Sequence, residues 1–252
     1  MKALLLDVGN SYMKWGVADA GIINRTGQIA QQKIREQGLG VLTSRLPRRV
    51  DAVMASNVAG PSFATRLAGV IGAHCGCDIR FAKTGRAAYG VTNRYTQPRR
   101  MGVDRWVAMI GAWAEIGKPC MVVDAGTAVT IDAISADGQH LGGQIFPGVQ
   151  LMARALASDT SDIPTVTTKK SAVFDGMDMF AVNTRDAVNS GALSAVVGGI
   201  ERSFATFKSN TRRPTLVLTG GDASRILKAL GVKALHRPNL VLQGLLHMLG
   251  DE

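Results

Sequence analysis

Two short segments of the chain place an aspartate, a glycine and a hydrogen-bonding side chain directly after an apolar run. Residues 4–14 read LLLDVGNSYMK, and residues 121–131 read MVVDAGTAVTI. The segments align at an acidic, a glycine and a polar position: Asp7 with Asp124, Gly9 with Gly126, and Asn10 with Thr127. Glycine in a tight turn lets the backbone approach a ligand closely, and the other two residue types can orient a metal-bound water and donate to a phosphate oxygen. Two such turns facing each other would hold one polyphosphate from both sides.

The first segment contains the groups that phosphoryl transfer needs. That reaction requires cations and amide donors on the β- and γ-phosphates, because charge shifts between their oxygens. The candidate phosphate loop comprises eight consecutive residues: Asp7, Val8, Gly9, Asn10, Ser11, Tyr12, Met13 and Lys14. In a regular strand, Lys14 would share a face with Tyr12 and Asn10. A solvated lysine beside Trp15 is the alternative interpretation of Lys14.

The residues Gly102-Val103-Asp104-Arg105 open a predicted helix with a carboxylate and a guanidinium side by side. An acidic residue in a first helical turn is ordinary capping and dipole chemistry, so a structural role for Asp104 stays open. A cation is disfavoured at that end of a helix. A pocket that needs both a base and an anion-binding group would explain the pair.

Three further motifs favour contact with a ligand, and each is also compatible with an ordinary structural role. Residues 219–222 (TGGD) follow a buried strand and fit either an adenosine-binding turn or a plain turn into a helix. Residues 142–148 (GGQIFPG) form a glycine-flanked strand that runs into a helix. Thr184 lies where a long helical region begins, so it is either a helix residue or a substrate donor.

The aligned segments lie 117 residues apart, nearly half the chain, so the elements that position them are predicted to repeat. Periodicity of apolar residues predicts two αβ halves, residues 1–98 and residues 99–252. In the first half we predict strands near 3–8, 12–18, 28–34, 51–56 and 78–82, and helices near 38–46 and 61–74. In the second half we predict strands near 120–124, 128–135, 141–146 and 215–221, and helices near 102–116, 148–157, 180–208, 223–230 and 239–249.

Length and composition agree with such a fold and exclude several other classes. The chain has 252 residues and is 46% hydrophobic, which suits one large domain or two small ones. Its N-terminal apolar run is interrupted at Asp7, which is too early for a signal peptide, and no run approaches the roughly 20 apolar residues of a membrane span. These features predict a soluble cytoplasmic protein with no membrane partner. The three cysteines argue against a disulfide framework.

The net charge of +10 permits contact with anions of several kinds. The basic residues are spread over the chain, and no aromatic residues interleave them as a platform for single-stranded nucleic acid would require. We therefore expect no nucleic-acid partner. A basic surface also suits ATP, and a basic surface without any ligand is the remaining alternative.

Five motifs then make a family resemblance specific. DVGNSYMK, GVDRW, VVDAGTAVTID, GGQIFPG and NTRDAVNSG run in this order from residue 7 to about residue 191, with TGGD beyond. In order and rough spacing the chain resembles the type III pantothenate kinases. The resemblance implies an α/β fold of two actin-like (ribonuclease H-like) halves with the nucleotide bound between them. It also implies phosphorylation of pantothenate by ATP, the first step of coenzyme A biosynthesis.

The resemblance further implies roles for individual residues. Residues 7–14 would bind the ATP phosphates with help from Thr127, and Asp124 would ligate a monovalent cation, K⁺ or NH₄⁺, in addition to the Mg²⁺ that accompanies ATP. Pantothenate would be bound by five residues of the first half and its border: Tyr95, Gly102, Val103, Asp104 and Arg105. Asp104 would be the catalytic base, and Thr184 would reach pantothenate from the partner chain of a homodimer. Ser11 departs from the threonine that is common in the family, but it keeps the hydroxyl.

Two other hypotheses stay open on the sequence. One is a kinase of the same fold for another small hydroxyl substrate, although larger sugar kinases of this fold usually need a longer chain. The other is a non-enzymatic accessory factor for transcription, although no convincing helix-turn-helix with a basic recognition helix is present. The retained phosphate loop and candidate base favour an enzyme.

Overall fold

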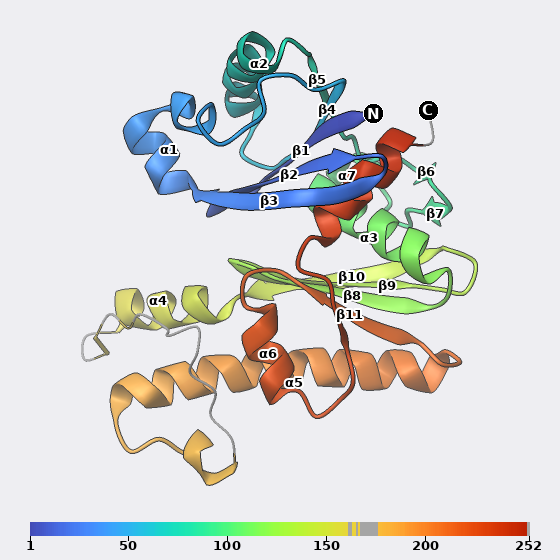
Figure 1. Cartoon of the computed structure of the whole chain (residues 1–252). Helices are drawn as coiled ribbons and strands as arrows, with labels where there is room; N and C mark the ends of the chain where they lie inside the picture. Colours follow the sequence, from blue (N-terminus) through green and yellow to red (C-terminus); the bar gives the residue numbers. More distant parts are fainter. Residues whose placement is uncertain (161–162, 165, 167–175, 251–252) are drawn as a thin grey trace. The chain divides into compact units, whose positions relative to one another are not determined.

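The computed structural model of the chain describes residues 1–160, 163–164, 166 and 176–250 (Figure 1). They form two compact units, one joining residues 1–115 to the C-terminal segment from Leu240, and the other spanning Ile116–Asn239. The units differ from the expected halves 1–98 and 99–252. The change of unit follows residue 115, and the last helix returns to the first unit because its packing partners lie there.

The first unit contains a five-stranded mixed sheet. Its order is β3 (Ile22–Ala30), β2 (Tyr12–Asp19), β1 (Lys2–Val8), β4 (Ala52–Asn57) and β5 (Ile79–Phe81). The first three strands form an antiparallel meander, β4 pairs in parallel with β1, and β5 pairs in parallel with β4. A separate two-stranded ladder joins β6 (Ala87–Ala88) to β7 (Val91–Thr92). The predicted strand–turn–strand around residues 7–14 is therefore confirmed.

The second unit repeats this sheet strand for strand. Its order is β10 (His140–Pro147), β9 (Ala128–Ile134), β8 (Cys120–Ala125), β11 (Thr215–Thr219) and β12 (Leu235–His236). Again the first three strands pair antiparallel, β11 pairs in parallel with β8, and β12 pairs in parallel with β11. The repeat that the two aligned segments predicted is thus a repeat of whole sheets, with β1 equivalent to β8.

Helices cover each sheet. In the first unit these are α1 (Gln31–Gln37), α2 (Pro61–Cys75), α3 (Val103–Ile116) and α7 (Leu240–Gly250), with the 3₁₀ turns η1 (Leu39–Leu42) and η2 (Pro98–Arg100). In the second unit they are α4 (Val149–Asp159), α5 (Thr184–Asn210) and α6 (Ala223–Ala229), with the 3₁₀ turn η3 (Gly176–Met179). None of the helices in the described part of the chain combines the length and hydropathy that a bilayer span requires.

The first sheet buries both of its faces. Leu4 and Leu6 of β1 pack on one face against Leu67 and Ile71 of α2, and because side chains alternate along a strand, the opposite face is left for α7. There α7 contacts β1 and β4. Helices α3 and α7 approach each other closely at two glycines. A Cβ atom at Gly111 would lie only 2.9 Å from the backbone nitrogen of Gly244, so their backbones pack directly on each other.

The second sheet is covered by the long helix α5. The buried residues of this helix recur every three or four positions: Leu193, Val196, Ile200, Phe204 and Phe207. That spacing presents one apolar stripe. The stripe packs against Met121 and Val123 of β8 in one buried cluster, which fixes the strand that carries Asp124.

Two predicted elements between residues 28 and 46 were wrong. The strand predicted at 28–34 ends at Ala30, because the backbone N–H of Gln31 donates to the carbonyl of Ser11 (2.9 Å) and the chain then turns into α1. The helix predicted at 38–46 is only the 3₁₀ turn η1, since Leu39 and Leu42 are buried with the three-residue spacing of that helix type. The other predicted helices are present with shifts of a few residues at their ends.

Candidate functional site

Hydrogen bonds fix the turn between β1 and β2 on both sides. The N–H of Gly9 donates to the carbonyl of Tyr12 (3.1 Å) and closes the turn. Gln31 supports it from the start of α1, with its backbone N–H donating to the carbonyl of Ser11 (2.9 Å) and its side-chain Nε2 donating to the carbonyl of Gly9 (2.8 Å). Gln31 is only 5% exposed, so these contacts are shielded from water. Three carbonyl oxygens of the loop are thereby held by protein donors.

A row of polar side chains crosses the end of the first sheet. Asp7 pairs with Lys14 across β1 and β2, and with Ser56 across β1 and β4. Cross-strand neighbours lie on the same face of a sheet, so a carboxylate, an ammonium and a hydroxyl stand side by side. Ser56 is fully buried, and its hydroxyl has no hydrogen-bond partner among the described residues. The sequence analysis missed Ser56, whose only signal was its position near the end of β4.

The candidate phosphate-loop residues differ in exposure, and Asp7, Gly9 and Lys14 are half-buried, between two extremes. Asn10, Ser11 and Tyr12 are exposed, so their side chains can reach a ligand. Val8 and Met13 are fully buried in the core of the first unit. These two residues can offer a ligand only their backbone groups.

The hairpin of the second unit differs from the first in length and charge. The N–H of Gly126 donates to the carbonyl of Ala128 (3.0 Å), and the turn is one residue shorter than that of the first hairpin. Asp124 therefore pairs across the strands with Thr130, where Asp7 pairs with a lysine. The second hairpin thus offers a carboxylate and hydroxyls without a neighbouring cation on β9.

Both glycine-rich motifs of the second unit converge on this hairpin. A Cβ atom at Gly220, where φ is +97°, would lie 2.5 Å from Oδ1 of Asp124 and would also meet the carbonyl oxygen of Ala125. The N–H of Gly148 donates to the carbonyl of Thr127 (2.9 Å). Gly148 and Gly220 therefore pack against the hairpin itself, at Thr127 and Asp124. The adenosine-binding role of residues 219–222 stays a prediction.

The structure brings Tyr95 and Arg105 into contact in the first unit. Nη1 of Arg105 donates to the phenol oxygen of Tyr95 (2.8 Å), and the guanidinium carbon lies 5.6 Å from the centre of the ring. Arg105 is 6% exposed, which is unusual for an arginine. The loop carrying Tyr95 is organised by Asn93, a fully buried residue whose Oδ1 accepts from the Tyr95 N–H (3.0 Å). The sequence analysis missed Asn93.

Asp104 lies in the first turn of α3, half-buried beside Arg105. Its Oδ1 accepts the backbone N–H of the next residue, Arg105 (2.8 Å). The carboxylate therefore accepts from one of the N–H groups in the first turn of the helix. A Cβ atom at Gly102 would lie 2.7 Å from this oxygen, which explains the glycine at that position. The carboxylate thus has one fixed orientation at the start of the helix. This geometry is compatible with both interpretations of Asp104.

Thr184 is exposed in the first turn of α5, in the second unit. The helix is capped by the preceding residue, Asn183, whose Oδ1 accepts the N–H of Asp186 (3.0 Å). Thr184 is therefore not needed as the cap. Its hydroxyl is available on the surface of its unit.

No three His, Cys, Asp or Glu side chains gather into a metal site in the part of the chain that the structure describes. Mg²⁺ is usually held by one or two carboxylates together with substrate phosphates. A single carboxylate such as Asp7 suits that mode of binding.

Comparison with known proteins agrees with this geometry. The sequence model of the type III pantothenate kinase family matches residues 3–206. The chain belongs to the type III pantothenate kinase family. Curated members include proteins from Azoarcus sp. (strain BH72), 40% identical over 96% of this chain and 88% of the relative, and from Burkholderia cenocepacia (strain J2315), 38% identical over 98% and 95%. A member from Halorhodospira halophila is 36% identical over 97% and 96%.

This member of the type III pantothenate kinase family also resembles solved structures of other proteins. A Campylobacter jejuni protein assigned to the Baf family of transcriptional activators matches with a TM-score of 0.62 at 20% identity, covering 98% of each chain. A Sinorhizobium meliloti protein assigned as a 2-dehydro-3-deoxygalactonokinase matches with a TM-score of 0.57 at 15% identity, covering 98% of this chain and 97% of the other. At such identities the matches establish the fold alone, the actin-like fold of two α/β lobes.

Proposed function

We propose that the chain transfers the γ-phosphoryl group of Mg·ATP to pantothenate and so makes 4′-phosphopantothenate, the first intermediate of coenzyme A biosynthesis. The observation that carries this proposal is the family match over residues 3–206 together with a complete phosphate loop. We expect the reaction to take place in the cytoplasm, where ATP is available.

The phosphate loop would bind the nucleotide from the first unit. Lys14 supplies a cation beside the carboxylate of Asp7, and Asn10 and Ser11 supply exposed donors on a turn whose carbonyls are already held. Asp7 is the carboxylate suited to the Mg²⁺ that arrives with ATP. Preorganised donors of this kind stabilise the charge that develops during transfer without having to reorganise. In the second unit, exposed Thr127 is the proposed phosphate donor.

Asp104 is the proposed catalytic base. The pantothenate hydroxyl must lose its proton as the phosphoryl group arrives, and a positioned carboxylate can orient this hydroxyl and accept the proton. Tyr95 and Arg105 would bind the rest of the substrate, with the buried guanidinium as the partner of the pantothenate carboxylate. The contact of Arg105 with Tyr95 supports this role, because it holds the guanidinium in one place.

Asp124 is the proposed ligand of a monovalent cation. The half-buried position of Asp124 at the end of β8, where its partner on β9 is Thr130 and not a cation, supports this role. Carboxylate and carbonyl oxygens are suitable ligands for K⁺, and NH₄⁺ could donate hydrogen bonds to the same oxygens. When bound, such an ion would balance the negative charge of the Asp124 carboxylate.

We also propose that two copies of the chain form a homodimer through the second unit and share a substrate pocket. The segment just before Thr184 exposes four large apolar side chains: Met177, Met179, Phe180 and Val182. Phe180 is 70% exposed and Val182 is 99% exposed, and apolar groups gathered in this way are typical of an interaction surface. Covering this surface with a second copy would bring Thr184 next to the partner.

Two assays test the proposal. Purified protein should release ADP from Mg·ATP in the presence of K⁺ and pantothenate, whereas glycerol or simple sugars in place of pantothenate should release little. A strong preference for another alcohol would favour the alternative kinase. For the dimer, mixing Asp104→Asn chains with Thr184→Arg chains should restore part of the activity, because one of the two hybrid sites carries neither change. If confirmed heterodimers stayed inactive, the pocket would not be shared.

A further inference from the structure

A hollow of about 720 Å³ lies between α1 and α2 in the first unit. Its volume is in the range of small-molecule sites, which is roughly 300–1,000 Å³. Asn10 of the phosphate loop and Gln31 line one end of it. We call it the α1–α2 hollow, and apart from Asn10 none of the residues proposed to contact the nucleotide or pantothenate lines it.

The lining of the α1–α2 hollow is apolar at its base and basic at its edge. Ile34, Leu39 and Phe63 are buried side chains that contribute the apolar part. Arg35 and Arg66 are exposed residues on the two helices. No aspartate or glutamate belongs to the lining, so a ligand with one anionic group and one apolar group fits it best.

Helix α2 adds to the preference for an anion. Its first turn contributes Ser62 and Phe63 to the lining, and its N-cap residue, Gly60, provides no side-chain cap. The positive end of the helix dipole therefore faces the same region as the arginines. Arg66 is held over this turn, with its guanidinium carbon 5.9 Å from the centre of the Phe63 ring.

Gln31 connects the hollow to the phosphate loop. The same buried side chain that lines the hollow donates from Nε2 to the carbonyl of Gly9 (2.8 Å), while its backbone N–H holds Ser11. A ligand that touches Gln31 or Asn10 would change the position or the mobility of this loop. A hydrogen bond thus joins a residue of the lining directly to the phosphate loop.

We propose that the α1–α2 hollow binds a small amphipathic phosphate ester and that its occupancy alters nucleotide binding through Gln31. The apolar part of the ligand packs on the buried base, and its phosphate pairs with Arg35 and Arg66, whose planar guanidinium groups match phosphate geometry. Only the effect on nucleotide binding rests on the proposed function, and the binding of the phosphate ester does not.

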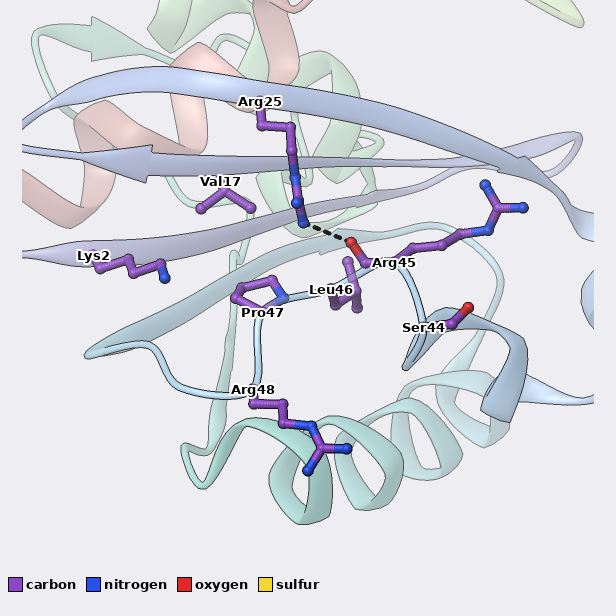
Figure 2. A pocket seen from close by; sticks show the side chains of 8 residues that line it. All are labelled: Lys2, Val17, Arg25, Ser44, Arg45, Leu46, Pro47 and Arg48. Atoms are coloured by element: carbon purple, nitrogen blue, oxygen red, sulfur yellow. Dashed lines mark hydrogen bonds between the residues drawn. The ribbon is translucent and has the colours of Figure 1, made fainter.

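A second basic hollow in the same unit provides a matched control. It has a volume of about 440 Å³ and is lined by Lys2, Arg25, Arg45 and Arg48 among others (Figure 2). It lies at the opposite end of β1 from Asp7, next to Lys2. Figure 2 shows the guanidinium groups of Arg45 and Arg48 pointing in different directions, while Arg25 donates to the carbonyl of Arg45 (2.7 Å). It presents four cationic residues against the two of the α1–α2 hollow, and its lining includes neither Asn10 nor Gln31.

The binding step is tested by calorimetric titration of the full chain with phenyl phosphate. The titration is run with Mg²⁺, a non-hydrolysable ATP analogue and pantothenate at saturation, so that the proposed substrate sites are filled. We expect saturable binding that weakens by about tenfold or more in the double variant Arg35→Gln/Arg66→Gln. The control Arg48→Gln should bind like the parent chain, and phenol should not bind. Equal weakening by the control, or no saturable binding to the parent, would overturn the site.

The coupling step is tested by the Kd of the ATP analogue with and without phenyl phosphate. The parent should show a shift of that Kd, and Gln31→Leu should show none while still binding phenyl phosphate. A Kd that does not respond in the parent, or a full response in Gln31→Leu, would refute the coupling. Circular dichroism and thermal melting establish that each variant is folded. None of these measurements needs turnover, so a failed kinase assay would be a separate result.

Discussion

The contact between Tyr95 and Arg105 allows a sharp test of the proposed pantothenate pocket. Tyr95→Phe removes the phenol oxygen that accepts from Arg105 Nη1 at 2.8 Å, and it leaves the ring under the guanidinium in place. A hydrogen bond to a charged group contributes about 1.5–3 kcal/mol. Tyr95 is only half-buried, so water can partly replace the lost acceptor, and the lower figure applies. About 1.5 kcal/mol corresponds to about a tenfold change in an equilibrium constant.

We therefore expect Tyr95→Phe to raise the KM for pantothenate by about tenfold while the KM for ATP stays nearly unchanged. Initial rates with varied pantothenate at saturating ATP and K⁺ measure this effect. Tyr89→Phe is the matched control, because it also removes one hydroxyl from the first unit, in this case a bond to the carbonyl of Met248 (3.1 Å). The control should lose a little stability and keep its KM values. If Tyr95→Phe behaved like the control, Arg105 would not be positioned for substrate by Tyr95.

Three further predictions follow from the site and the core. Asp104→Asn should lower kcat by about 10²–10⁴ with the Kd of ATP nearly unchanged, as expected for a lost base, whereas a purely capping role predicts near-normal kcat. Asp124→Asn should weaken the response of the rate to K⁺, and an unchanged K⁺ titration would remove Asp124 from the cation site. Burial raises the pKa of Cys120 to about 12 from 9.0, so the unfolded chain loses this proton first as the pH rises. The free energy of unfolding should therefore fall by about 1.4 kcal/mol between pH 8 and pH 10 relative to Cys120→Ala, and parallel pH profiles in denaturant titrations would contradict this.

The sequence predicted the repeated part of the fold because the two hairpins carry the same pattern. In each segment the apolar run predicts the strand, the aspartate marks the end of the strand and the glycine predicts the turn. Both hairpins are present in the structure, at β1–β2 and at β8–β9. The division into units was not predictable in the same way. It depends on where α3 and α7 pack, and their contact through Gly111 and Gly244 joins residues far apart in the sequence.

The sequence named the candidate site residues from motifs and from the family resemblance, and their roles stay predictions. Arg105 was named from its motif and Tyr95 from the resemblance, and the structure brings these two side chains together. Three supporting residues were missed, namely Gln31, Ser56 and Asn93. A lone glutamine, serine or asparagine is not part of a spacing pattern in the sequence. The sequence therefore could not predict which part of the chain each of these residues lies next to after folding.

The most direct test of the central claim is the mass of the product. Purified chain is incubated with pantothenate, Mg·ATP and K⁺, and the reaction is followed by liquid chromatography with mass detection. The account predicts 4′-phosphopantothenate, formed in equal amount to ADP and absent when either substrate is omitted or when Asp7→Asn replaces the parent chain. A folded parent chain that forms no phosphopantothenate, or that releases ADP without it, would contradict the account.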